Sequence, residues 1–95
     1  ISYEQKSFYD ILKSTAEKFG FDYPENKLLK LSAEIKKIVE DTSKYTDWAN
    51  RDDIKSKLEM DLTLLLKEYG YPPQTNKKVF KEVFEQAENF KKYND

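Results

Sequence analysis

The chain has 95 residues, enough for one domain, with 38% hydrophobic and 37% charged residues and a formal net charge of −1. Seven Tyr, six Phe and one Trp supply buriable surface for a small core, so the composition argues against disorder. The absence of Cys and His excludes disulfides, thiolate zinc sites and Ser-His-Asp triads, and no apolar run approaches the ~20 residues of a membrane span.

The first half of the chain predicts two helices. Apolar residues recur at helical spacing over residues 3–19, and a second pattern of this kind runs over residues 24–41. Gly20 is expected to end the first helix. Asp22 and Glu25 suit a capping box at the start of the second.

The middle of the chain predicts a linker followed by a third helix. Residues 41–50 show no helical period and are rich in small polar side chains, which is typical of a linker. We expect Asn50 to cap a helix that continues to Tyr69. Leu64 widens the apolar face of this helix.

Two glycines carry the same stop signal. Gly20 and Gly70 each follow a helical pattern and precede proline, and glycine adopts the left-handed conformation that ends a helix without a steric penalty. We therefore expect Phe21 and Tyr71, the aromatic residues that follow, to fold back onto the last helical turn.

A fourth helix is predicted over residues 76–93, with Thr75 as its cap. All four patterns are amphipathic and none alternates as a strand would. Residues 1–95 are therefore predicted to be a single all-α domain. Its four amphipathic helices form two helical hairpins with antiparallel pairing, joined by a linker that contains the only Trp.

The charged residues indicate neither a catalytic centre nor an autonomous DNA-binding face. Lysines are spread along every predicted helix, often three or four positions from an acid, as on solvated helix faces. The densest acidic group is Asp47, Asp52 and Asp53. The adjacent pair would point about 100° apart on a helix and suits its N-terminal dipole. We expect no catalytic, cofactor-binding or metal-binding residues in this chain.

Two residues near the linker have alternative interpretations. Trp48 is either pinned over the helical core or offered to a partner as an anchor, and we favour the pin. Arg51 is the only arginine, and arginine makes bidentate contacts that lysine does not. It is an internal clamp to a carboxylate such as Glu85 or Asp47, an interface residue, or an ordinary surface charge.

The segment from Tyr69 to Pro73 forms a rigid aromatic and proline corner. Its default role is the turn between helices, yet a rigid surface also suits docking because little entropy is lost on binding. The hypothesis for partner binding therefore rests on five residues, Trp48, Arg51, Tyr71, Pro72 and Pro73.

The same residues carry a family resemblance, which covers about residues 47–90. The motifs are Asp47-Trp48-x-x-Arg51-x-Asp53-Ile54-Lys55-x-Lys57-Leu58, then Leu65-Leu66-Lys67-x-Tyr69-Gly70-Tyr71-Pro72-Pro73, then Val83-Phe84-Glu85-Gln86-Ala87-Glu88. This pattern resembles the C-terminal helical domain of the restriction and motor (R) subunit of type I restriction-modification enzymes. The family often has further basic residues in the third helix, where this chain has Glu59 and Asp61.

The chain begins at Ile1 without an initiator Met, so we expect it to be a piece of a larger protein, and the absence of Cys favours a reducing, cytoplasmic location. The resemblance implies that the larger protein is an R subunit and that this chain is its C-terminal domain. The parent would be an ATP-dependent, DNA-translocating endonuclease that uses ATP and Mg²⁺. Its partners would be the modification (methyltransferase) and specificity subunits, with DNA bound through the parent complex and no membrane contact. The domain itself would be a non-catalytic assembly module. The alternatives are an auxiliary DNA-contacting element and a purely structural brace of the motor.

Overall fold

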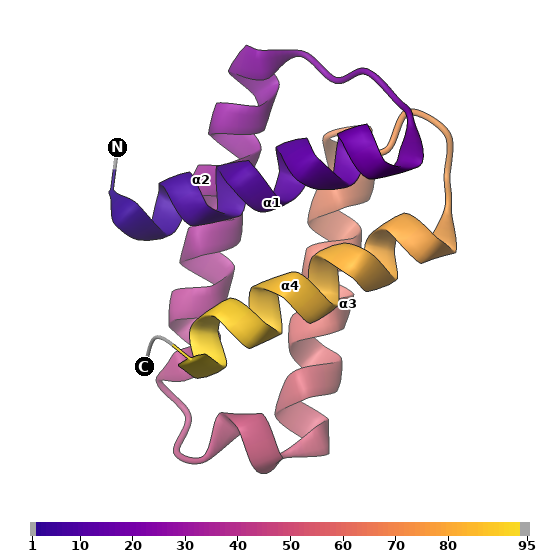
Figure 1. Ribbon diagram of the computed structural model, residues 1–95. Helices are drawn as coiled ribbons and strands as arrows, with labels where there is room; N and C mark the ends of the chain where they lie inside the picture. The colour runs from indigo at the N-terminus through magenta and orange to yellow at the C-terminus, as the bar shows by residue number, and fades with distance from the viewer. Residues whose placement is uncertain (1, 94–95) are drawn as a thin grey trace.

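The computed structural model describes residues 2–93, and four α-helices and one 3-10 turn make up their regular structure. The helices are α1 (Tyr3–Phe19), α2 (Glu25–Ser43), α3 (Asp52–Glu68) and α4 (Lys77–Tyr93), and the 3-10 turn η1 is Trp48–Asn50 (Figure 1). No strand occurs within this range, so the all-α prediction is confirmed. No helix within residues 2–93 is long and apolar enough to cross a membrane.

The helices form two crossed layers (Figure 1). α1 and α4 run in opposite directions in one layer: the rings of Phe8 and Phe90 are 5.2 Å apart, and Lys18 pairs with Glu82 further along. α2 and α3 run in opposite directions in the other layer. The antiparallel pairs are therefore α1 with α4 and α2 with α3, whereas the helices joined by the two glycine turns cross each other. The all-α, four-helix prediction is confirmed, but the predicted antiparallel pairing within each hairpin is wrong, because a short turn brings two helices together without fixing the angle between them.

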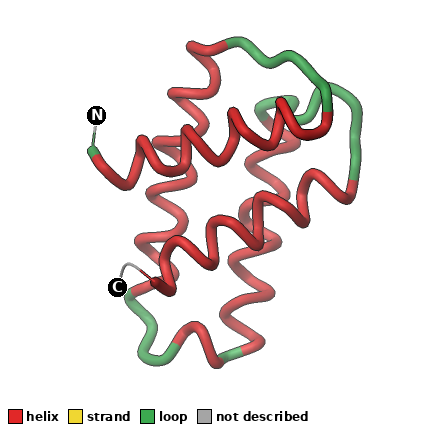
Figure 2. The backbone as a smooth tube through the Cα atoms, in the orientation of Figure 1, coloured by secondary structure: helices red, strands yellow, loops and turns green. Residues whose placement is uncertain are grey.

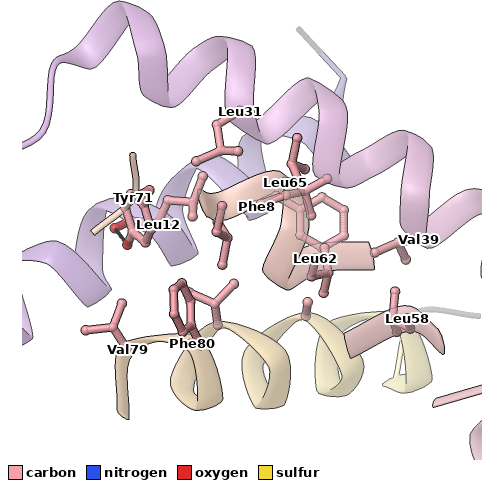
Figure 3. Close-up of a cluster of buried hydrophobic side chains, with 14 of the residues drawn as sticks. Phe8, Leu12, Leu31, Val39, Leu58, Leu62, Leu65, Tyr71, Val79 and Phe80 are labelled. Carbon is pink, nitrogen blue, oxygen red and sulfur yellow. Dashed lines mark hydrogen bonds between the residues drawn. The ribbon is translucent and has the colours of Figure 1, made fainter. Parts of the chain in front are cut away.

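The core lies between the layers and draws side chains from all four helices (Figure 3). Among its most buried members are Phe8, Leu12, Leu31, Ile35, Leu58, Leu62, Leu66, Val79 and Val83. These residues follow the helical spacing of the sequence, as an apolar stripe turned toward a core must. Leu64 is different, because it lies about 200° around α3 from Leu62 and is 62% exposed. Its predicted role in the apolar face is wrong.

The predicted cap of the second helix is not formed. Pro24 is the N-cap residue, and its carbonyl accepts from the amides of Lys27 and Leu28 at 3.1 and 3.0 Å. No side chain caps this helix. A capping box needs its polar residue directly before the first helical residue, and Asp22 lies too early in the chain for α2, which begins at Glu25.

The predicted caps of the third and fourth helices are each displaced by one residue. Asn50 ends the 3-10 turn and its side-chain amide donates to Asp47 Oδ1 at 2.7 Å, so it does not cap α3. At α4, the Oδ1 of Asn76 accepts from the amide of Lys78 at 2.9 Å, which is the capping role predicted for Thr75.

Both predicted helix stops are confirmed. Gly20 and Gly70 have φ angles of 71° and 64°, in the left-handed region. The amide of each following aromatic residue donates to the carbonyl five residues earlier, Phe21 to Ala16 at 3.0 Å and Tyr71 to Leu66 at 2.9 Å. This is the Schellman arrangement. The connections that follow these two helix ends, from α1 to α2 and from α3 to α4, meet at one corner of the molecule (Figure 2).

Candidate functional site

The five residues predicted to bind a partner lie in two places. Trp48 and Arg51 precede α3, whereas Tyr71, Pro72 and Pro73 follow it. α3 has 17 residues, so about 25 Å separate its ends at 1.5 Å per residue. The structure therefore presents two separate regions, which we call the linker end and the proline corner.

At the linker end, Trp48 is part of the core. It opens the 3-10 turn after Asp47, whose φ of 58° places it in the left-handed region, and only 6% of Trp48 is exposed. The interpretation of this residue as an internal pin is confirmed. Lys55, Glu88 and Lys92 surround it, and burial raises the pKa of the Glu88 carboxyl.

Arg51 is exposed and its internal partner differs from the prediction. Its Nη2 donates to Asp53 Oδ2 at 2.9 Å, and this hydrogen bond is the main reason why the pKa of Asp53 lies below its usual value. Glu85 and Asp47 were the predicted partners, and Asp47 instead accepts from Asn50. Arg51 is thus paired with a neighbour two residues away and remains accessible from solvent.

At the proline corner, Tyr71 is a structural residue. It is 1% exposed, and its hydroxyl donates to the carbonyl of Leu12 on α1 at 2.6 Å. Its ring meets those of Phe21 and Tyr23 edge-on, each with centroids 5.2 Å away. Burial raises the pKa of Tyr71 far above its ordinary value. These contacts tie the α3–α4 connection to α1 and to the α1–α2 connection.

The two prolines of this corner differ in exposure. A cis peptide bond joins Tyr71 to Pro72, which is buried, whereas Pro73 is exposed. The hydroxyl of Tyr23 donates to the carbonyl of Tyr69, which adds a second link between the two connections. Of the five predicted residues, only Arg51 and Pro73 are therefore on the surface.

A groove of about 470 Å³ opens beside Pro73. One wall comes from the end of α1 and the residues after it, and the other from the α3–α4 connection and the start of α4. The apolar lining residues are Phe19, Phe21, Pro72, Pro73 and Val79, and Asp22, Gln74 and Asn76 add polar groups. Because both connections are held by tyrosine hydroxyl bonds and ring contacts, the groove has fixed walls. We call it the corner groove.

A second groove was not foreseen in the sequence. It lies between α3 and α4, has a volume of about 490 Å³, and is lined by Glu59, Thr63, Lys67, Thr75, Lys77, Phe80, Lys81 and Phe84. The sequence signal that could have revealed it is the repeat of lysine and phenylalanine at positions 77, 80, 81 and 84, which share one helical face.

Within residues 2–93 no three Asp or Glu side chains gather closely enough to hold a metal ion. The acidic residues at the start of α3 instead have structural roles, since Asp53 accepts from Arg51 and both Asp52 and Asp53 lie in a first helical turn. The described surface includes both the corner groove and the groove between α3 and α4.

The chain matches a known protein family. No curated protein and no solved structure matches the chain. Residues 1–93 match the family described as "Type I restriction enzyme HindI endonuclease subunit-like, C-terminal". Since that match spans nearly the whole chain, the protein belongs to the family of C-terminal domains of type I restriction enzyme endonuclease subunits.

Proposed function

We propose that this domain is a non-catalytic assembly module that docks the endonuclease subunit onto the modification and specificity subunits of a type I restriction enzyme. The observation that carries the proposal is the corner groove, a recess with both apolar and polar lining residues between two connections that Tyr71 and Tyr23 hold together. A recess that is already ordered loses little entropy when a partner enters it.

The activities of the whole endonuclease subunit are proposed only because the chain belongs to this family. The endonuclease subunit would translocate DNA with ATP and Mg²⁺ and would act in the cytoplasm, within a complex that also contains the methyltransferase. This domain would contribute contacts to that complex through its two exposed candidates, Arg51 and Pro73. Trp48, Tyr71 and Pro72 would support these contacts from the interior.

Size-exclusion chromatography with light scattering tests the proposal. The 95-residue chain is mixed at micromolar concentration with the modification–specificity core of its own restriction system. We expect a co-eluting complex whose mass is the sum of its parts. Separate peaks would contradict docking and favour a brace of the motor.

A pair of matched variants locates the contact. Pro73→Asp places a charge at the rim of the corner groove, whereas Met60→Asp places the same charge on the exposed side of α3, away from both of its ends; Met60 is 59% exposed. We expect the first variant to weaken the complex about tenfold or more because a docked partner would remove water from the new charge without pairing it, and the second to have little effect. Equal effects would exclude the corner groove as the contact.

A further inference from the structure

The groove between α3 and α4 combines an apolar floor with a basic rim. Phe80, 7% exposed, and the partly buried Phe84 form the floor. The exposed lysines Lys67, Lys77 and Lys81 surround it, and Lys81 has only a long contact of 3.9 Å with Glu85. Apolar side chains can therefore enter between positive charges. We call this surface the lysine groove.

The positive charge is local, since the whole chain has a net charge of −1. Three lysines and a single acid, Glu59, line the lysine groove. The first turn of α4 contains Lys77 and Lys78 and no acid, whereas α1, α2 and α3 each have an acid there. Lysines at a helix N-terminus oppose the helix dipole, so their placement does not serve the stability of α4. It does reinforce the positive potential of the lysine groove.

We propose that the lysine groove binds an acidic amphipathic helix of a partner subunit in the restriction complex. Phe80 and Phe84 are four residues apart on one helix, so they lie about 6 Å apart along its axis. Apolar anchors spaced at i and i+4 on a bound helix have the same separation and would cover both rings. Carboxylates flanking these anchors would reach the three lysines.

The chemistry of the groove favours a protein helix over nucleic acid. Two phenylalanines offer nothing to a phosphate backbone, and the Glu59 carboxylate repels phosphate while it can accept a hydrogen bond from a peptide. Duplex-binding proteins also present longer basic stripes than three lysines around an apolar floor. This inference rests on the proposed docking function and adds the chemical class of the partner.

The test compares two triple charge reversals in the endonuclease subunit that carries this domain. The groove variant is Lys67→Glu, Lys77→Glu and Lys81→Glu. The control variant is Lys27→Glu, Lys30→Glu and Lys37→Glu, three exposed lysines of α2 that give the same change in net charge. The affinity of each for the modification–specificity core is measured between 50 and 300 mM NaCl, after circular dichroism has confirmed equal helicity.

We expect the groove variant to weaken the complex about tenfold or more and the control variant by less than about threefold. A charge reversal weakens binding where the lysine faces a carboxylate of the partner, and only the groove lysines are proposed to do so. The wild-type affinity should fall with salt, and that dependence should be smaller in the groove variant. Thr63→Trp, which fills the groove without changing its charge, should also weaken the complex.

Four results would overturn the inference. If both triple variants bind equally well, the docking function stands and only the lysine groove is excluded. If the wild type forms no complex, both proposals fail. If the chain binds a 20-base-pair duplex at low salt and only the groove variant loses that binding, the occupant is nucleic acid. If the groove substitutions lower the melting temperature of the endonuclease subunit measured without its partner subunits, the occupant is a segment of the same chain.

Discussion

At the scale of single residues, Tyr71 shows how one side chain serves both the turn and the core. Its hydroxyl reaches the backbone of α1 from 59 residues away, while its ring packs against Phe21 and Tyr23 in the other connection. A buried hydroxyl without a partner would destabilise the fold, so the bond to Leu12 fixes where the corner sits on α1. The walls of the corner groove depend on this contact.

Tyr71→Phe removes that hydrogen bond while it keeps the ring. We expect the free energy of unfolding to fall by about 1 kcal/mol, the net value of a typical intramolecular hydrogen bond. Urea denaturation followed by circular dichroism measures the change. Tyr93→Phe is the control, because Tyr93 is 79% exposed. A Tyr71→Phe protein as stable as the wild type would show that the bond to Leu12 contributes nothing.

The pKa of Tyr71 also predicts a pH dependence. Burial raises this pKa above its ordinary value of 10.0, so the neutral hydroxyl is favoured in the folded state. Its contribution to stability is therefore complete below pH 10 and is lost as the pH rises above it, by up to about 1.4 kcal/mol per pH unit. Lysines titrate in the same range, so the quantity to measure is the difference between the wild type and Tyr71→Phe. That difference should shrink above pH 10, and a constant difference would contradict the prediction.

At the scale of the elements, the helix ends are determined by local chemistry. α1 and α3 stop where a glycine adopts a left-handed conformation and the following aromatic amide bonds back to the helix. The residues at which the helices begin depend less on a single local signal. Asn50 and Thr75 have side chains suited to capping, but the 3-10 turn engages Asn50 and the neighbouring Asn76 caps α4.

Gly70→Ala and Gly20→Ala test the helix stops. A Cβ added at either glycine would meet no atom within 4 Å, so the cost is conformational and not a clash. We expect each substitution to lower the free energy of unfolding by about 1–2 kcal/mol, the penalty of the left-handed conformation for an L-residue. Asn tolerates this conformation better, so Gly70→Asn should cost less than Gly70→Ala. Chemical denaturation that ranks Asn and Ala equally would contradict this explanation.

At the scale of the whole molecule, two crossed antiparallel layers share one core (Figure 3). Leu62 lies in that core with no exposed surface. Its truncation leaves a cavity that touches more than one helix, which local rearrangement fills only in part.

Leu62→Ala is therefore expected to cost about 2–5 kcal/mol of unfolding free energy. Leu64→Ala is the matched control on the same helix, because Leu64 is 62% exposed and its truncation should cost about 0.5 kcal/mol or less. Thermal and urea denaturation of both variants measure the contrast. Similar losses for the two leucines would contradict the prediction that Leu62 stabilises the core and Leu64 does not.

The sequence by itself determined the number of helices, their bounds to within about two residues and the two glycine stops. These follow from side-chain periodicity and backbone conformation, which act between residues that are close in the chain. It also indicated that Trp48 is internal. Of the five candidate docking residues that it named, Arg51 and Pro73 are exposed, whereas Trp48, Tyr71 and Pro72 are buried.

Only the tertiary structure decided which helices lie antiparallel, that Arg51 pairs with Asp53, and that Tyr71 bonds to Leu12. It also decided that the lysines of α3 and α4 surround one groove. An amphipathic stripe shows that a face is buried but not against which partner, because any apolar face can cover any other. Contacts between distant residues follow from how the four stripes pack together, and both candidate docking grooves are products of that packing.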